Sequence, residues 1–314
     1  MAKTRALKRR IRSVENTRKI TRTMELVATS KLKRAQDRVV AARPYARALA
    51  AAIADLLAPE LVERYPLLRQ PAPPAKGGPV RAAVILVTSN RGLAGAFNAN
   101  LIRTARRRMA ELEEAGYVVE LHAVGKKGVR FFQFAKRELA LARVDVGDRP
   151  TAQHALELVQ PLMQEYEAGA LALVDVVYAT FKSALSTPPT VLRVLPVEAG
   201  AGSQGSGARG DRGTRPLTPD ARHLAPGTPN YILKPGADEI LGALLPLYVK
   251  NQVYRALVET AASEQGARRT AMKSATDNAG EMLDILTRTF NRARQAQITQ
   301  EIAEIVGGAE AQKG

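Results

Sequence analysis

The segment from Thr88 to Asn98 comes nearest to a nucleotide-binding loop, because Gly92 and Gly95 lie there between a predicted strand and a predicted helix. A P-loop needs a lysine followed by serine or threonine after its second glycine, and a dinucleotide fingerprint needs three glycines at fixed offsets. The segment has neither pattern. Gly125-Lys126-Lys127-Gly128 also follows a predicted strand, but it has two glycines and no hydroxyl. We interpret the first segment as a tight turn whose glycines permit positive φ, and the second as a basic turn.

Other residue types that support catalysis or metal binding are scarce or badly spaced. The chain has three histidines, His122, His154 and His223. None lies at the i, i+4 spacing that places two ligands of one metal on a helix, and we expect His122 to be a packed residue of a strand. Acidic residues gather on a helix face that we expect to be solvated, at Glu111, Glu113 and Glu114. Cysteine is absent, which excludes thiolate nucleophiles and disulfides. The sequence predicts no catalytic residue, no cofactor and no metal site.

The charge of the chain points to acidic partners. Lysine and arginine total 47 against 30 aspartate and glutamate, for a formal charge of +17. The first 34 residues carry twelve basic and two acidic side chains, a net charge of +10. Such a run is usually a solvated face, but its concentration at one end favours an interaction surface. Nucleic acid is one candidate partner, although stacking aromatics, zinc fingers and helix-turn-helix spacing are missing. Acidic protein loops fit the charge equally well.

A long helix is predicted from Lys3 to about Leu57, where apolar or small residues recur at alternating steps of three and four. One row is Leu7, Val14, Thr21, Ala28, Ala35, Ala42, Leu49 and Leu56, and the other is Ile11, Arg18, Glu25, Leu32, Val39, Ala46 and Ile53. The rows are interrupted at Arg18, Thr21 and Glu25. We expect Pro44 to bend the helix without ending it. A helix of about 80 Å exceeds a compact domain and needs a partner helix of similar length.

That partner is predicted from Asp238 to Val306, a stretch of about 100 Å in which Pro246 disturbs only the first turns. Its spaced small and apolar residues are Met272, Ala275, Ala279, Met282, Leu286, Phe290, Ala293, Ile298, Ile302 and Ile305. The chain must return after the domain inserted between the two helices. We therefore expect an antiparallel coiled coil.

The intervening domain alternates predicted strands and helices. The strands are Val80 to Thr88, Tyr117 to Val124, Leu171 to Thr180 and Thr190 to Val197, and the helices are Asn98 to Glu114 and Thr151 to Glu167. This order predicts a Rossmann-like α/β domain with a mainly parallel sheet.

The chain thus divides into an N-terminal coiled-coil helix (1–65), a linker (66–79), the α/β domain (80–197), a Gly/Pro-rich insertion and loop (198–235) and a C-terminal coiled-coil helix (236–314). The fold class is α/β plus long helices. No run of 18 apolar residues predicts a membrane span.

Several sequence blocks resemble one known family. They are Arg10 to Thr21, Thr23 to Leu32, Asn90 to Leu93 with Phe97-Asn98, Gly125 to Gly128, Ser263 to Gln265, Ala275 to Gly280, Asn291 to Thr299 and Glu304 to Glu310. Together they resemble the gamma subunit of F-type rotary ATP synthases. The resemblance spans both termini and the middle of the chain.

The resemblance implies a central rotor stalk that is not itself a catalyst. The paired helices would turn inside a ring of alternating alpha and beta subunits, with the α/β domain below, and torque would couple proton flow to ATP synthesis. The implied partners are the alpha, beta and epsilon subunits and the membrane c-ring, with no nucleic acid and no membrane span. The implied location is peripheral, on the cytoplasmic side of a bacterial membrane. The alternative prediction is a basic coiled-coil nucleic-acid-binding protein; a nucleotide-using α/β enzyme is a third.

The resemblance also implies two sets of contact residues. Those meeting the acidic lever loops of the beta subunits are Lys19, Arg22, Met24, Lys31, Arg294, Gln295 and Thr299. Those near the membrane ring are Tyr231, Lys234 and Pro235. Lys234 stands where family members often have an acidic residue. Chloroplast relatives carry a cysteine pair for redox control, which this chain lacks.

Overall fold

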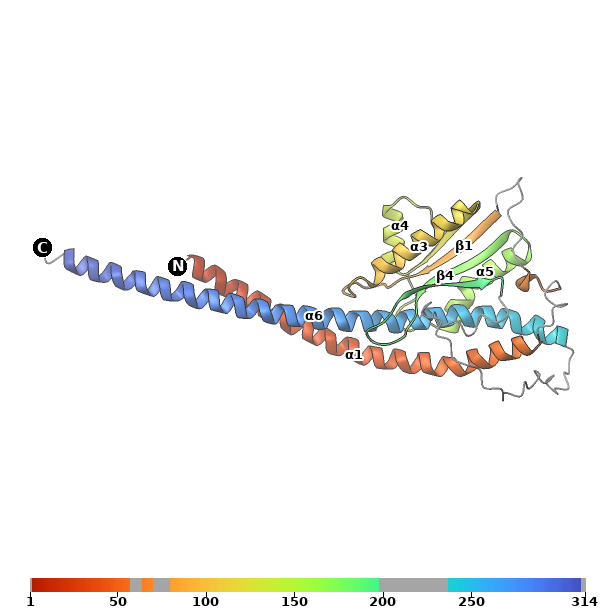
Figure 1. Ribbon diagram of the computed structural model, residues 1–314, viewed down its shortest axis with the longest axis horizontal. Coiled ribbons are helices and arrows are strands. Elements are labelled where there is room, and N and C mark those ends of the chain that lie inside the picture. Colours follow the sequence, from red (N-terminus) through yellow and green to blue (C-terminus); the bar gives the residue numbers. More distant parts are fainter. Residues whose placement is uncertain (1, 57–63, 70–79, 198–236, 312–314) are drawn as a thin grey trace, which may run out of the picture.

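The computed structural model describes residues 2–56, 64–69, 80–197 and 237–311. Two long helices lie side by side, and an α/β domain packs against one end of the pair (Figure 1). The start of α1 and the end of α6 lie at the other end. The predicted insertion at 198–235, with Tyr231, Lys234 and Pro235, lies outside the described residues.

The two helices are α1 (Ala2–Leu56) and α6 (Ala237–Ala311), and each continues through its internal proline. They run antiparallel, as predicted. The hydroxyl oxygens of Thr21 and Thr276 lie 2.8 Å apart, and Thr4 Oγ1 donates to Gln297 Oε1 at 3.2 Å. Because Thr4 is only two residues from the start of α1, the last turns of α6 project beyond α1 (Figure 1).

The predicted rows of α1 form its buried face. Seven of their members are buried: Thr21, Ala28, Leu32, Ala35, Val39, Leu49 and Ile53. The other members are half-buried, apart from Arg18, which is exposed. Alanine and threonine at these positions let the two backbones approach closely. Before the interruption at Arg18, the row members Leu7, Ile11 and Val14 are only half-buried.

The predicted face of α6 is confirmed in its middle and wrong toward its end. Met272, Ala279 and Leu286 are buried, but Leu283 is buried where Met282 was expected, and Met282 is 46% exposed. A step of four residues from Ala279 keeps the helical face better than a step of three, since a turn takes 3.6 residues. Further exposed apolar residues are Ile298, Ile302 and Ile305. Ile302 and Ile305 lie where α6 has passed the start of α1, and Ile298 lies beside its first turn.

The α/β domain contains five strands and three helices. The elements are β1 (Val80–Val87), α3 (Phe97–Glu114), β2 (Tyr117–Val124), α4 (Lys126–Phe134), β3 (Leu141–Arg143), α5 (Ala152–Glu167), β4 (Leu171–Ala179) and β5 (Pro189–Leu195), preceded by the 3-10 turn η1 (Pro66–Leu68). The sheet order is β3-β2-β1-β4-β5. Strands β1 to β4 are parallel and β5 is antiparallel to β4, so the predicted mainly parallel sheet is confirmed.

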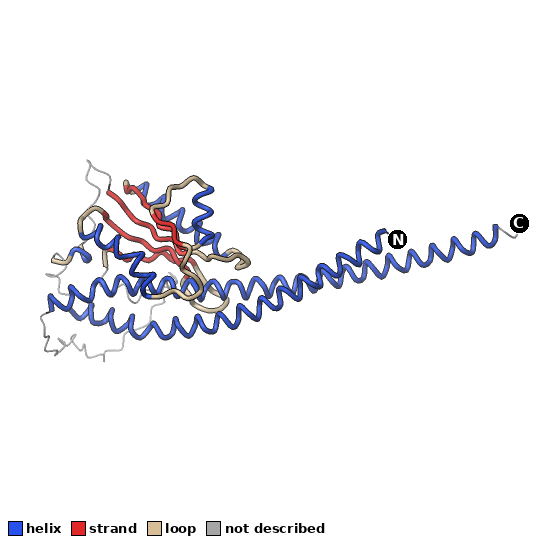
Figure 2. Tube along the Cα trace, turned by 180° about the vertical axis from the view of Figure 1, so that it is seen from behind, coloured by secondary structure: helices blue, strands red, loops and turns tan. Residues whose placement is uncertain are grey.

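Helices cover both faces of this sheet, which explains why β1 is apolar at nearly every position. Ala82, Val84 and Leu86 pack with residues of α3 on one face. Ala83 and Ile85 face the other way and pack with α5, α6 and the end of α1. Figure 2 shows the strands enclosed between helical layers. The long helices are therefore part of the core of the α/β domain.

Two elements of the domain were missed by the sequence analysis. The predicted basic turn after β2 is wrong, because Lys126 begins helix α4. Strand β3 has only three residues, too few for an alternating pattern. The tight turn after β1 differs in detail, since Leu93 (φ 63°) and Gly95 (φ 58°) have positive φ whereas Gly92 does not.

One buried amide of α6 has no partner within the described part of the chain. Gln265 is 3% exposed, and neither its Oε1 nor its Nε2 makes a hydrogen bond. Burying an unpaired polar group costs about 1–3 kcal/mol.

We therefore predict that Gln265→Met, which keeps the side-chain length, raises the free energy of unfolding by about 1–3 kcal/mol. Urea denaturation of the full chain followed by circular dichroism measures this. The exposed Gln133→Met serves as the matched control and should change stability by less than about 0.5 kcal/mol. A Gln265→Met variant no more stable than the parent would show that the amide is satisfied in solution.

Candidate partner-binding surface

An exposed apolar stripe follows one face of α1. Ile20 is 59% and Val27 is 52% exposed, and Met24 is half-buried between them. The spacing of i, i+4 and i+7 places the three side chains on one face, and Lys31 continues the same face. We call Ile20, Met24 and Val27 the apolar stripe. Its position beside the buried face, on the outside of the helix pair, makes it available to another protein.

Lys19 and Arg22 lie on a different face of α1. At 3.6 residues per turn they are about 140° and 160° round the helix from Met24. Both line a groove of about 940 Å³ between the helices, together with Asp277 and Asp284 of α6. Lys19 pairs with Glu15 at 3.3 Å and Arg22 with Glu25 at 3.0 Å. The side chains of Lys19 and Arg22 are 72% and 62% exposed, and pairs of such solvated cations contribute about 1 kcal/mol or less, so both cations can exchange partners.

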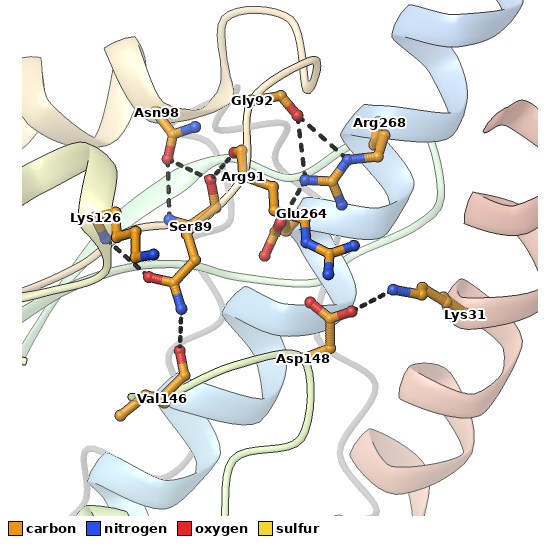
Figure 3. Close-up of polar contacts among 11 residues, drawn as sticks. Lys31, Ser89, Arg91, Gly92, Asn98, Lys126, Val146, Asp148, Glu264 and Arg268 are labelled. Atoms are coloured by element: carbon orange, nitrogen blue, oxygen red, sulfur yellow. Dashed lines mark hydrogen bonds and ion pairs between the residues drawn. The ribbon is translucent and has the colours of Figure 1, made fainter. Parts of the chain in front are cut away.

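Lys31 instead joins α1 to the α/β domain. Its Nζ lies 2.6 Å from Oδ2 of Asp148, and Arg38 Nη1 donates to the carbonyl oxygen of Asp148 at 3.0 Å. Asp148 belongs to the loop before α5 (Figure 3). Burial raises the pKa of Asp148, but the hydrogen bond and charge of Lys31 outweigh burial, and the pKa lies below its usual value.

A second contact joins α6 to the same edge of the domain. Arg268 donates to the carbonyl oxygen of Gly92 at 3.3 Å and pairs with Glu264 at 2.5 Å (Figure 3). Glu264 and Arg268 are both buried. Burial raises the pKa of Glu264 in spite of the neighbouring guanidinium. We call the contacts of Lys31 and Arg38 with Asp148, and of Arg268 with Gly92, the polar clamp.

The loop after β1 is fastened to the start of α4. The backbone N–H groups of Lys126, Lys127 and Gly128 donate to Asn90 Oδ1, Ser89 O and Thr88 Oγ1 at 2.9, 3.1 and 2.9 Å. A helix N-terminus at this edge is where phosphate binds in nucleotide-binding α/β proteins. Here the chain's own loop occupies those amides, which supports the interpretation of the loop as structural.

Gly125 makes this close approach possible. Its φ is 96°, and a Cβ on it would stand 2.2 Å from the carbonyl oxygen of Thr88. Any larger residue would push the loop away from α4. Residues 125–128, one of the sequence blocks that carry the family resemblance, therefore have a packing role in the structure.

The predicted contact residues of α6 lie at another level of the helix pair. Arg294, Gln295 and Thr299 are exposed, and Thr299 Oγ1 donates to the carbonyl oxygen of Gln295 at 3.0 Å. Arg294 is about 27 Å along the axis from Thr276, which marks the level of Thr21. The structure therefore spreads the seven predicted lever contacts over several levels and faces and does not gather them into one site.

The remaining candidate residues behave as packing or surface groups. His122 is half-buried in β2, as expected, and burial lowers the pKa of its imidazole. Glu111 pairs with Arg107 and Arg108, and Glu113 pairs with Arg137, on the outside of α3. The described residues contain no cluster of metal-ligating side chains. Among the helices that the structure describes, none is long and apolar enough to cross a membrane.

Sequence analysis missed the polar clamp. Asp148 and Arg38 carry no local signal, because their contact joins residues 110 positions apart. Glu264 and Arg268 did carry a local signal, because an i, i+4 ion pair inside an apolar helical stretch can be recognised in the sequence.

These features define a class of protein: a long antiparallel helix pair with exposed contact surfaces, anchored in an α/β domain. A family model described as ATP synthase matches residues 3–312. The ATP synthase gamma chain of Gemmatimonas aurantiaca is 55% identical over 314 residues and covers all of both chains. That of Leptospira biflexa is 40% identical over 311 residues, 99% of each chain. The chain therefore belongs to the ATP synthase gamma chain family.

Solved structures support the fold. The Euglena gracilis mitochondrial ATP synthase structure of OSCP, F1 and c-ring contains a chain that aligns with a TM-score of 0.66 at 19% identity, covering 99% of this chain and 94% of that one. A rotor structure from the same organism aligns with a TM-score of 0.61 at 18% identity, covering 95% of this chain and 99% of that one. The nucleic-acid-binding alternative finds no support in these comparisons.

We predict that Asp148→Asn lowers the free energy of unfolding by about 1 kcal/mol at pH 7, a modest value because both partners are one-third exposed. A depressed carboxyl pKa stabilises the fold above the unfolded pKa of about 3.9 and loses that effect as pH falls through the folded pKa. The difference between parent and variant should therefore vanish at low pH.

Urea denaturation at several pH values, in a double-mutant cycle with Lys31→Met, measures this contribution. The exposed Asp277→Asn is the matched control. Full additivity of Asp148→Asn and Lys31→Met would contradict a direct contact between the two side chains.

Proposed function

We propose that this chain is the central rotor stalk of a proton-translocating F-type ATP synthase. It performs no bond-making step and transmits torque between the ion-driven membrane ring and the catalytic ring of alpha and beta subunits. The observation that carries the proposal is the helix pair itself, which projects from the α/β domain with outward-facing side chains that nothing in the described chain covers. The solved relatives described as rotor and as OSCP, F1 and c-ring support it.

The helix pair differs from side to side, as a rotating stalk requires. One face of α1 presents the apolar stripe, and another presents Lys19 and Arg22 beside the groove. Turning such an axle brings different surfaces to each of three catalytic sites in succession. A partner that binds one surface better than another shifts between conformations by that difference in affinity.

The proposed contacts with the beta-subunit levers are Lys19, Arg22, Met24, Lys31, Arg294, Gln295 and Thr299. Acidic lever loops would be attracted by the +10 charge of the first 34 residues. Individual exposed pairs are weak, which suits a contact that must form and break in each turn. Lys31 is already paired with Asp148, so a lever that reached Lys31 would contact this ion pair.

The part of α6 that extends beyond α1 supports the proposal that other subunits surround this end of the stalk. Ile302 is 56% and Ile305 is 71% exposed, on turns that α1 does not reach. Exposed isoleucines on a solitary helix end indicate a surface that another protein surrounds. In the proposed assembly that protein is the ring of alpha and beta subunits.

The opposite end is proposed to face the membrane. Tyr231, Lys234 and Pro235 would contact the c-ring, and the epsilon subunit would bind beside the α/β domain. The complex would lie peripherally on the cytoplasmic side of a bacterial membrane, in line with the bacterial relatives. The proposed organisation of the chain is an N-terminal helix (1–65), a linker (66–79), the α/β domain (80–197), an insertion and loop (198–235) and a C-terminal helix (236–314).

The experiment uses the complex reconstituted with alpha, beta and membrane subunits, in which the chain should co-purify in fixed ratio. Met24→Lys places an ammonium in the apolar stripe opposite the acidic levers. One added pair of about 1 kcal/mol slows release about fivefold. ATP-driven proton pumping should therefore fall by a similar factor while the complex still assembles.

Val40→Lys is the matched control, because Val40 is also an exposed apolar residue of α1 (61%) and lies about 24 Å along the helix from Met24. It should leave pumping unchanged. Failure of the chain to co-purify would overturn the proposed function. Normal pumping by Met24→Lys would overturn the stripe as the lever contact.

A further inference from the structure

A cavity of about 580 Å³ opens at the carboxyl edge of the parallel sheet. The ends of β1 and β2, the loop before α5 and one side of α6 line it. Val144, which is 44% exposed, and the half-buried Val146 form its accessible apolar wall, whereas Val87, Val124 and Leu257 of the lining are at most 3% exposed. In open α/β sheets, ligands bind outside the carboxyl ends of the strands, where the strand order changes direction. Strand β1, between β2 and β4, is that point in this sheet.

The charged groups around the cavity do not balance one another. The lining contains three carboxylates, and each has a cation of its own: Asp145 pairs with Arg143, Asp148 with Lys31, and Glu264 with Arg268. None of those three cations lines the cavity.

The lining also contains three basic side chains, Arg91, Lys126 and Arg149, and none of them makes an ion pair with another described residue. They come from the loop after β1, the start of α4 and the loop before α5. Arg91 and Lys126 are drawn in Figure 3, where Arg91 lies near the paired carboxylates Asp148 and Glu264. The lining therefore has three cations on three separate segments: Lys126 and Arg149 have no charge partner among the described residues, and Arg91 lies within the field of the Asp148 carboxylate, which Lys31 already neutralises.

His154 adds a neutral hydrogen-bond donor to the lining. His154 Nδ1 accepts from the backbone N–H of Thr151 at 3.2 Å, in the capping box of α5. Accepting at Nδ1 leaves the proton of a neutral imidazole on Nε2, which is then a donor. The amides at the start of α4 are already bonded to the loop after β1, so an anion here must be held by side chains.

We propose that this cavity binds a small phosphate-bearing organic anion, with Arg91, Lys126 and Arg149 at the phosphoryl oxygens and the apolar part of the ligand on Val144 and Val146. The volume lies in the range of small-molecule sites, and the mostly polar lining suits a charged ligand. Guanidinium and ammonium groups are the side chains that recognise phosphate. This site shares no residue with the apolar stripe.

The test is isothermal titration calorimetry on the full chain without alpha or beta subunits, because those bind nucleotides themselves in the proposed assembly. Adenosine monophosphate, inorganic phosphate and sulfate are titrated at low ionic strength. We expect saturable binding of one adenosine monophosphate per chain, at least tenfold tighter than inorganic phosphate and sulfate. Equal affinity for adenosine monophosphate and inorganic phosphate would assign the site to free phosphate and overturn the role of Val144 and Val146.

Lys126→Ala and Arg91→Ala should each weaken binding of adenosine monophosphate about tenfold. Arg103→Ala, which removes an exposed cation from α3, is the control and should leave it unchanged. Circular dichroism confirms that each variant is folded. Absence of saturable binding at 10 mM adenosine monophosphate would overturn the proposal. An equal loss of affinity in Arg103→Ala would also overturn it, because that would show diffuse attraction to a basic surface.

Discussion

The burial of one helix face against another is the interaction on which this molecule depends. Helix α1 has 55 residues and extends well beyond the α/β domain, and among the described helices α6, with 75 residues, is the one long enough to cover it. Leu32, Ala35 and Val39 of α1 pack with Val258 and Ala262 of α6 where the pair meets the domain. Further out, small residues such as Ala28 and Ala279 keep the helices close. The pairing leaves the outer faces free for partners.

The polar clamp complements this packing. Apolar contacts hold the helices against the sheet but specify rotation about the axis weakly, whereas hydrogen bonds are directional. Lys31 and Arg38 fix α1 to Asp148, and Arg268 fixes α6 to Gly92. In the proposed rotor, a turning force applied to the α/β domain would pass to both helices through these contacts. The cavity beside the clamp offers a place where a ligand could act on that connection.

Much of the fold could be predicted because it follows from local periodicity. The rows from Leu7 to Leu56 and from Ile11 to Ile53 identify the buried face of α1, and continuous apolar runs identify the buried strands. Helix α4 could not be found in this way, because its start depends on Gly125 and on contacts with a distant loop. The isoleucines near the end of α6 follow the helical period but are exposed, since periodicity does not show where the partner helix begins.

The candidate site also combines residues that the sequence indicates with contacts that only the tertiary structure shows. Met24 lies on a stripe that the spacing of Ile20 and Val27 makes visible in the sequence. The pairing of Lys31 with Asp148 required the tertiary structure, because nothing near either residue indicates it. Charge counting located the cations within the first 34 residues, and their distribution over several faces emerged only from the geometry of the helix pair.

The most direct measurement of the central claim is a cross-link between the two helices. The chain has no cysteine, and the hydroxyl oxygens of Thr21 and Thr276 lie 2.8 Å apart, so Thr21→Cys with Thr276→Cys should close a disulfide under mild oxidation. If the helices turn as one body, the oxidised variant, assembled with its partner subunits, will rotate under ATP at the rate of the reduced one. Failure to form the disulfide, or arrest of rotation once it forms, would contradict a single rigid axle.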